Sequence, residues 1–535
     1  MGRGFFCFAE KLEFFALRKE IAMLVKTYTA ALVSVDAHLV TVEVNVEPGA
    51  AVTLVGLPDT SVKESYQRIE TAAEYSGYRL HGFRSVINLS PGDLKKEGTA
   101  YDLPIAIGLI GACQYFKSTC LDRYVMVGEL SLDGTIRPVK GALPIAIKAR
   151  ELGFEGLIVP RENAREAAVV NKLKIFAADT LVEVVHFLEG TGELDLVQVD
   201  TRAEFEAHRE YYVHDFADVK GQENVKRAME VAAAGGHNIL MVGASGSGKS
   251  MMAKRVPSIL PPFTLGESLE TTKIYSVAGK LAHNTTLMTA RPFRAPHHSI
   301  SMPALVGGGT SPRPGEISLA HNGVLFLDEL AEFNRSVLEL MRQPMEERTI
   351  TVSRAKATVD YPASFMLVAA MNPCPCGYYN HPTRECVCPP GSVQKYLSKV
   401  SGPLMDRIDI QIEIAPVPFE EISKSTPAEP SSLIRSRVIA ARARQTARFA
   451  DFLHVHCNAQ MTAPLTQRFA RPDEEGMQLL KKAMERFGLS ARAYDRILKV
   501  ARTIADLAGS ETIAAEHIRE AILYRNLDRA SWGAV

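Results

Sequence analysis

The sequence has no excess of charge of either sign. Lysine and arginine number 61, aspartate and glutamate also number 61, and the formal net charge of the 535 residues is zero. Bulk charge therefore favours no acidic partner, so any contact with nucleic acid must come from local basic features. The hydrophobic fraction of 46% is ordinary for a globular protein, and the length leaves room for about three domains, each with its own core.

Long apolar runs are also missing, as are internal repeats of fixed period and low-complexity tracts. No stretch approaches the roughly 20 apolar residues of a membrane span. Residues 5–8 are apolar, but Glu10 and Lys11 end this run too early for a secretory signal. We therefore expect a cytoplasmic protein that has no membrane partner.

One glycine-rich segment is the most informative feature of the chain. It follows the apolar run 238–242 and consists of Gly243, Ala244, Ser245, Gly246, Ser247, Gly248, Lys249 and Ser250. A buried strand that leads through such a turn into a helix can wrap phosphates with backbone N–H groups. In this arrangement Lys249 holds the β- and γ-phosphates of a nucleotide, and the Ser250 hydroxyl binds Mg²⁺.

A pair of adjacent carboxylates supports this interpretation. The apolar run 323–327 predicts a second buried strand, which ends at Asp328 and Glu329. Asp328 suits the Mg²⁺ ion and its water shell, while Glu329 suits polarising an attacking water. The sequence therefore predicts that the chain binds and hydrolyses ATP with Mg²⁺, and that Lys249, Asp328 and Glu329 belong to the catalytic set.

A third predicted strand, 365–370, is followed by Asn372. The amide of Asn372 can reach the γ-phosphate or the attacking water and report hydrolysis. The alternative is a simple strand-ending residue before Pro373. Between the second and third strands, alternation on both sides of residues 353–356 predicts a hairpin with a basic tip.

Arg407 lies where an apolar stretch resumes, within residues 402–409. An arginine here can complete a neighbouring subunit's site as an arginine finger. The alternative is an intrachain salt bridge with Asp406 or Asp409.

The C-terminal part offers a further arginine for the γ-phosphate. Ser490 predicts the start of a helix that carries Arg492 and Arg496 one turn apart. Arg492 is the better candidate for touching the γ-phosphate, and Arg496 is the reserve. A solvated helix face is the alternative for both.

Four of the eight cysteines are clustered: Cys374, Cys376, Cys386 and Cys388. Two C-x-C pairs across a short polar loop can supply four thiolates to one tetrahedral Zn²⁺. C-x-C is tighter than the usual C-x₂-C, and disulfides are the alternative, although a reducing cytoplasm disfavours them. The segment 291–299, R-P-F-R-A-P-H-H-S, predicts a structured loop rather than a metal site, because adjacent histidines on an extended chain point apart.

Composition divides the chain into segments. Residues 1–22 form a leader that either precedes a true start at Met23 or makes a short amphipathic helix. Strands alternate with short helices over 23–190, a polar linker covers 191–212, and the ATPase core covers 213–424. A Pro/Ser-rich hinge leads into a helical region over 433–525. The predicted fold class is α/β with a helical C-terminal part.

In their order along the chain, these motifs resemble the magnesium-chelatase-like AAA+ proteins. The segment from Met23 to about Arg525 resembles, more specifically, the ComM (YifB) family of bacteria. The resemblance implies an AAA+ core with a helix-2 insertion at about 278–318, the hairpin at 350–359, a helical lid over 433–525, and hexamers around a pore. It also implies an ATP-driven DNA branch-migration motor of natural transformation.

The first segment, 23–190, is similar to the Lon-protease catalytic fold. The matching stretch is 96–102, in which Ala100 stands where the Lon pattern places its serine. The partner lysine would fall near Leu143, and Lys140 has no serine to activate. The resemblance therefore implies an inactive protease fold without peptidase activity, with a role in assembly or DNA binding.

Two functions follow from the resemblance. In the first, a hexamer moves single-stranded or branched DNA in recombination as a helicase or translocase, and Arg354 and Lys356 from each subunit line the pore with cations. In the second, the ATPase drives metal insertion by a separate chelatase, or remodels a protein. Chelatase ATPase subunits lack the Lon-like segment and the four-cysteine cluster, so we expect the first function.

Overall fold

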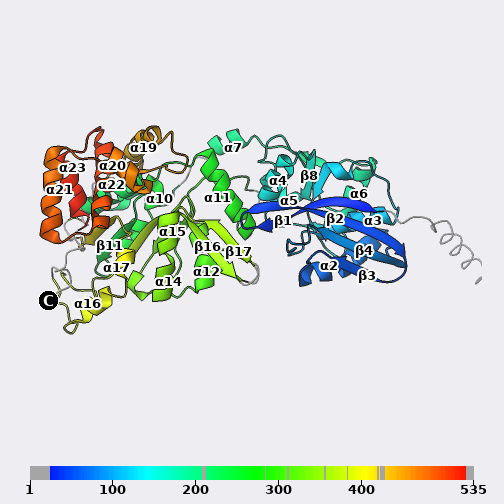
Figure 1. Cartoon of the computed structure of the whole chain (residues 1–535), viewed down its shortest axis with the longest axis horizontal. Helices are drawn as coiled ribbons and strands as arrows, with labels where there is room; N and C mark the ends of the chain where they lie inside the picture. Colours follow the sequence, from blue (N-terminus) through cyan, green and yellow to red (C-terminus); the bar gives the residue numbers. More distant parts are fainter. Residues whose placement is uncertain are drawn as a thin grey trace, which may run out of the picture. The chain divides into compact units, whose positions relative to one another are not determined.

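The computed structural model describes residues 24–207, 212–282, 285–309, 312–354, 357–381, 383–417, 421 and 428–525, so the predicted leader lies outside it. The chain forms two compact units (Figure 1). The first contains Met1–His208 and Thr272–Met288, and the second contains Arg209–Thr271 and Thr289–Val535. None of the described helices combines the length and the apolar character that crossing a membrane requires.

The first unit is built on an eight-stranded mixed sheet with the strand order β10-β9-β8-β5-β1-β2-β4-β3. Valines alternate along β2 (Asp36–Pro48), where Val40, Val42 and Val44 are fully buried and the residues between them are partly exposed. Helix α3 (Asp102–Ala112) is buried along its whole length, which explains its uniformly apolar sequence. The alternation of strands and helices predicted for 23–190 is confirmed.

The remaining elements of the first unit range from two-residue strands to the 16-residue helix α2. Its other strands are β1 (Val25–Val33), β3 (Val52–Val55), β4 (Phe83–Ser90), β5 (Tyr124–Met126), β6 (Glu129–Leu130), β7 (Ile136–Arg137), β8 (Gly156–Pro160), β9 (Lys174–Ala178) and β10 (Asp195–Val197). Its other helices are α2 (Thr60–Tyr75), α4 (Ala142–Glu151), α5 (Arg161–Ala167), α6 (Leu181–Glu189) and α7 (Thr201–Ala207).

Two features of this unit bear on the sequence predictions. Ala100 lies just before α3, and Leu143 is fully buried near the start of α4, so neither position supplies a nucleophile or a base. Within the expected linker 191–212, β10 pairs with β9 and α7 follows, so this part is folded with the first unit. Of the insertion expected at 278–318, the residues up to Met288 also belong to the first unit.

The second unit contains a five-stranded parallel sheet with the strand order β12-β15-β18-β11-β19. Its strands are β11 (Ile239–Gly243), β12 (Phe293–Arg294), β15 (Val324–Leu327), β18 (Met366–Met371) and β19 (Ile410–Ile414). The neighbouring strands β15, β18 and β11 are buried throughout, which explains their continuous apolar runs. The three strands predicted around the site motifs are therefore confirmed.

Short helices accompany this sheet. They are α8 (Glu223–Gly235), α9 (Lys249–Ala253), α10 (Val256–Ile259), α11 (Leu265–Ala278), α12 (Met302–Val306), α13 (Glu316–Leu319), α14 (Arg335–Leu340), α15 (Arg342–Glu347), α16 (Ser392–Leu397) and α17 (Gly402–Met405). Of α11, only the residues up to Thr271 belong to the second unit. Two-residue strands β13 (Gly307–Gly308) and β14 (Arg313–Pro314) pair antiparallel.

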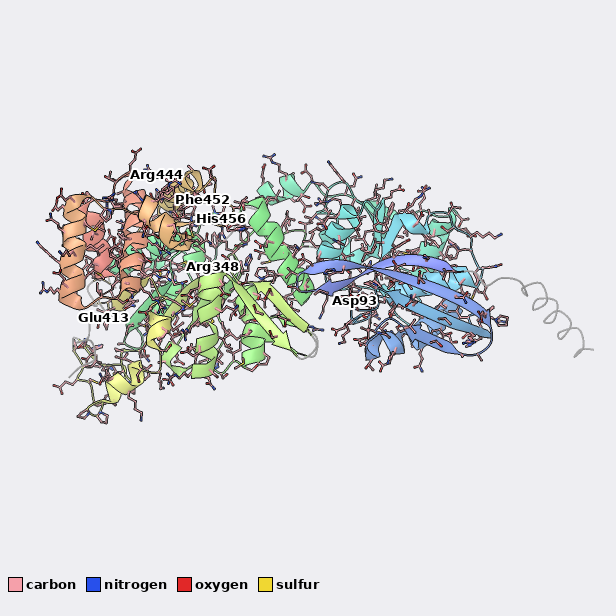
Figure 2. All side chains as sticks on the ribbon, in the orientation of Figure 1. Asp93, Arg348, Glu413, Arg444, Phe452 and His456 are labelled. Atoms are coloured by element: carbon pink, nitrogen blue, oxygen red, sulfur yellow. The ribbon has the colours of Figure 1, made fainter. Side chains whose placement is uncertain are left out.

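The predicted hairpin is present as β16 (Thr349–Arg354) and β17 (Ala357–Pro362), paired antiparallel from Thr349 opposite Pro362 to Arg354 opposite Ala357. Its base is fixed to the core of the second unit. Tyr361 is fully buried, and its hydroxyl donates to the carbonyl of Pro312 at 2.8 Å. Arg348, labelled in Figure 2, follows α15 and donates to the carbonyl of Phe365 at 3.0 Å.

The C-terminal part is helical, as predicted, and lies in the second unit. It comprises α19 (Ser431–Arg448), α20 (Ala463–Phe469), α21 (Glu474–Phe487), α22 (Ala491–Ala508) and α23 (Ala515–Leu523). The predicted start signal at Ser490 is confirmed, since its hydroxyl accepts from the N–H of Ala493 at 3.2 Å. Every residue of α22 from Val500 to Asp506 is buried, and Val500, Ala501, Ile504 and Ala505 belong to the core shared with the sheet.

Candidate nucleotide-binding site

A cavity of about 310 Å³ lies where the neighbouring strands β15, β18 and β11 end. Ligands of open α/β sheets bind at this carboxyl edge. The residues that line the cavity are Ser245, Gly246, Ser247, Gly248, Lys249, Ser250, Met251, Asp328, Glu329, Met371 and Asn372. The fold therefore brings the glycine-rich loop, the acidic pair and the strand-ending amide to one place.

The loop geometry depends on glycine at two positions. Gly248 has φ +91°, a left-handed conformation that glycine adopts at little cost, and it directly precedes α9. At Gly243, where β11 ends, an added Cβ would lie 2.4 Å from the carbonyl oxygen of Ile414 in β19. Glycine here lets the two strands approach closely while the chain turns into the loop, with Ala244 as the next residue.

The ammonium group of Lys249 is held by three acceptors. Its Nζ donates to the carbonyl of Gly243 at 2.6 Å, to the carbonyl of Ala244 at 2.8 Å, and to Oδ1 of Asn372 at 3.2 Å. Burial lowers the pKa of Lys249, and the carboxylates of Asp328 and Glu329 partly offset this effect. Lysine and Asn372 therefore meet at the point where a phosphate of a bound nucleotide would lie.

The two predicted Mg²⁺ ligands are in direct contact. The hydroxyl of Ser250, on α9, donates to Oδ2 of Asp328 at 2.6 Å. The other carboxylate oxygen, Oδ1, accepts from the N–H of Glu329 at 2.9 Å, which fixes the carboxylate plane. A hydroxyl and a carboxylate are hard oxygen donors of the kind that Mg²⁺ prefers, so these residues fit the ion.

Glu329 has an unusual backbone and an unpredicted partner. Its φ of +52° is left-handed, a conformation that costs a non-glycine residue about 1 kcal/mol. Nδ1 of His298 lies 3.1 Å from Oε2 of Glu329. The rings of His297 and His298 are only 4.0 Å apart, so the prediction that these side chains point apart is wrong. Periodicity does not reveal this contact, because it joins a loop to a distant strand end.

The two predicted arginines of the hydrolysis machinery lie outside the cavity lining. Arg407 is buried, and its Nη2 lies 2.8 Å from Oε1 of Glu346, which differs from both predicted partners, Asp406 and Asp409. Arg492 is exposed, and its Nη1 lies 3.3 Å from Oδ2 of Asp406. Their roles toward the γ-phosphate stay predictions.

Arg496, the reserve candidate, is engaged differently. Its Nη1 lies 2.8 Å from Oδ1 of Asp409, which is fully buried at the start of β19. This pair ties α22 to the sheet, so Arg496 is a structural residue of the interface between the helical part and the core.

The DNA-contact candidates belong to the hairpin. Arg354 is the last residue of β16, and Lys356 lies outside the described residues. The four clustered cysteines begin two residues after Asn372, and their sulfur atoms all lie within 4.8 Å of one another.

The fold and the site together define the class of protein. A parallel sheet with the phosphate-binding loop after one strand, an acidic pair after a neighbouring strand, and a helical C-terminal part are typical of P-loop ATPases of the AAA+ type. Family models agree: "Magnesium chelatase, subunit ChlI" matches residues 215–422, "Subunit ChlI of Mg-chelatase" matches 42–163, and "Magnesium chelatase, subunit ChlI C-terminal" matches 428–525.

Whole-chain relatives narrow this class. YifB of Escherichia coli is 43% identical over 504 residues, which cover 94% of this chain and 97% of the relative. Competence protein ComM of Haemophilus influenzae is 42% identical over 506 residues, with the same two coverages. The chain therefore belongs to the ComM/YifB family of magnesium-chelatase-like ATPases.

More distant similarity is partial. Lon protease 2 of Bacillus subtilis is 27% identical over 124 residues, or 23% of this chain, so the likeness of the first unit to Lon is weak. The magnesium-chelatase 38 kDa subunit of Rhodobacter capsulatus is 24% identical over 180 residues, or 30% of this chain and 51% of the relative.

Proposed function

We propose that this chain is an ATP-hydrolysing DNA motor that works as a homohexamer and drives branch migration in recombination. The observation that carries the proposal is the presence, in one unit, of the nucleotide cavity and of a hairpin that is anchored through Tyr361 and whose first strand ends at Arg354. Membership of the family of ComM, a protein named for competence, supports a role in natural transformation.

The predicted site residues of the cavity each have a part in ATP hydrolysis. Lys249 binds the β- and γ-phosphates, and the loop N–H groups surround them. Ser250 and Asp328 hold Mg²⁺, which when bound neutralises the charge that develops on the phosphates. Glu329 accepts a proton from the attacking water, and His298 orients its carboxylate. Asn372 exchanges its contact with Lys249 for the γ-phosphate or the water.

The hairpin suits a sequence-independent grip on DNA. Ile350 and Val352 in β16 and Val359 in β17 are buried, so most of the length of the hairpin is packed against the second unit. Cations at its tip bind phosphates whatever the base sequence, and a ring of subunits multiplies a small local charge on a protein of zero net charge.

The test compares ATP hydrolysis by the full chain with and without single-stranded and branched DNA. We expect DNA to stimulate hydrolysis and Glu329→Gln to abolish it while ATP binding persists. The combined change Arg354→Ala and Lys356→Ala should weaken DNA binding and flatten its salt dependence, by about 0.7 in the logarithmic slope for each lost contact to single-stranded DNA. Removing the exposed pair Lys481 and Lys482 on α21 deletes the same charge and serves as the matched control.

A second candidate is an ATPase that drives a separate chelatase or remodels a protein, and the match to three ChlI models favours it. Hydrolysis that is indifferent to every DNA tested, together with DNA affinity unchanged by the hairpin variants, would reject the motor in favour of this role.

A further inference from the structure

We propose that Cys374, Cys376, Cys386 and Cys388 bind one Zn²⁺ ion, and that this metal holds Asn372 in position at the edge of the nucleotide cavity. The metal site stands on its own geometry. Its effect on hydrolysis rests on the proposed function, because Asn372 can influence hydrolysis only if the chain is an ATPase.

The spacing of the sulfur atoms matches a single tetrahedral ion. The Sγ atoms of Cys374 and Cys376 are 3.3 Å apart, those of Cys376 and Cys386 are 3.6 Å apart, and those of Cys374 and Cys386 are 3.8 Å apart. A tetrahedral Zn²⁺ with Zn–S bonds of about 2.3 Å places its sulfurs about 3.8 Å from one another. All four sulfurs lie within 4.8 Å of one another, which leaves room for one ion and not for a cluster of several irons.

The arrangement does not suit disulfides. A disulfide brings two sulfurs to about 2.05 Å, and all four cysteines are free thiols in the structure. Here three of the sulfurs converge on one another instead of forming separate pairs. Convergence on a common centre is the arrangement of ligands.

The surroundings of the cluster are organised around the sulfurs. The N–H of Tyr379 donates to Sγ of Cys374 at 3.3 Å, the kind of outer contact that orients a metal ligand. The loop that returns the chain to the second C-x-C pair is held by its own contacts: Arg384 lies 5.2 Å from the ring centre of Tyr378 and donates to its hydroxyl at 2.8 Å. Cys374 is fully buried and the other three are half-buried, so an ion can enter from solvent.

The cluster is joined to the nucleotide cavity in two ways. Cys374 lies two residues beyond Asn372, whose Oδ1 contacts Nζ of Lys249 at 3.2 Å. Gly377, within the first cysteine turn, has φ +82°, and a Cβ added there would lie 3.8 Å from the backbone N of Ser245 in the phosphate-binding loop. A metal that fixes this turn therefore fixes both the end of β18 and the position of Asn372.

The first test measures zinc in the purified full chain. We expect about one Zn²⁺ per chain, released by a mercurial that caps thiols, and a cobalt-substituted protein with the visible spectrum of a tetrahedral sulfur site. Cys386→Ser with Cys388→Ser should lose the metal. Cys120→Ser, which removes a half-buried cysteine of the first unit, should keep it. Metal-free wild-type protein, or a double variant that retains a full equivalent, overturns the site.

The second test asks whether the metal acts through Asn372. The zinc-free double variant should keep its affinity for a fluorescent ATP analogue within about threefold and lose about tenfold in kcat, as should Asn372→Ala. Because both changes disturb one contact, the triple variant should lose no more than either alone. Multiplied losses, or a normal kcat without zinc, reject the coupling. Wild-type protein that binds zinc without hydrolysing ATP rejects the proposed function and leaves the metal site standing.

Discussion

Two arginines on one helix allow the effect of burial on an ion pair to be measured within a single protein. Arg496 and Arg492 lie one turn apart on α22, and each pairs with an aspartate near the start of β19. The Arg496 and Asp409 side chains are 18% and 1% exposed, whereas those of Arg492 and Asp406 are 60% and 33% exposed. We expect Arg496→Ala to destabilise the second unit strongly and Arg492→Ala to have little effect on stability.

The size of the destabilisation expected for Arg496→Ala follows from the contacts that Asp409 keeps once the guanidinium is gone. Without Arg496 its carboxylate keeps the N–H of Asn238 at 3.0 Å and Nδ1 of His237 at 3.5 Å. Burial lowers the pKa of His237, so this ring is a poor substitute for the guanidinium. Burial alone would raise the pKa of Asp409, but the charge of Arg496 and the contact with His237 hold it far below the usual range. Leaving a buried charge unpaired costs about 3–5 kcal/mol, against about 0–1 kcal/mol for an exposed pair.

The assay is thermal unfolding followed by circular dichroism, combined with ATP hydrolysis at a temperature where both variants are folded. At about 2 °C per kcal/mol for a unit of this size, Arg496→Ala should lower Tm by roughly 6–10 °C and Arg492→Ala by less than about 2 °C. Arg492→Ala should instead reduce hydrolysis if this arginine reaches the γ-phosphate. Equal losses of stability from the two variants would refute the reasoning from burial. Adding Asp409→Asn to Arg496→Ala should recover part of the loss, because it removes the unpaired charge.

Three further predictions address other residues. His298→Ala should lower kcat about tenfold with little change in KM, because Glu329 loses its orienting contact, and steady-state kinetics with an unchanged kcat would contradict that role. Burial and the charge of Arg496 lower the pKa of Lys499 to about 8 from 10.5, so the folded state binds this proton less tightly than the unfolded chain. Stability should therefore rise between pH 8 and 10.5, and Lys499→Met should stabilise the unit by about 2–3 kcal/mol at pH 7 and lose that advantage near pH 10 in denaturant titrations. Tyr361→Phe should cost about 1 kcal/mol, because the carbonyl of Pro312 loses its donor, and an unchanged denaturation midpoint would count against this anchor of the hairpin.

The sequence predicted well those features that arise from local pattern. Continuous apolar runs identified β11, β15 and β18, and the fixed spacing of the glycine-rich loop identified Lys249 and Ser250. Parallel strands all end at the same edge, so residues that follow three predicted strands meet in one cavity.

Contacts between segments that are distant in the sequence could not be predicted from local sequence pattern. The partner of Arg407 proved to be Glu346, and Arg496 proved to be a structural residue, because partner choice depends on how helices pack against the sheet. The contact of His298 with Glu329 and the folding of β10 onto the first sheet have the same origin. None of these pairs is marked by periodicity or spacing.

The threefold contact of Lys249 has a mechanical consequence. An ammonium group has three hydrogens, and here all three are directed to Gly243, Ala244 and Asn372. A phosphate oxygen can be accepted as a new partner only when one of these contacts breaks. The hydrogen bond to Asn372 is the longest of the three, and Asn372 is the only one of the three acceptors that is a side chain. This hydrogen bond is therefore the one that breaks. In the proposed function, nucleotide binding thereby frees the amide of Asn372 from Lys249 to contact the γ-phosphate or the attacking water, and loss of the nucleotide returns that amide to the lysine.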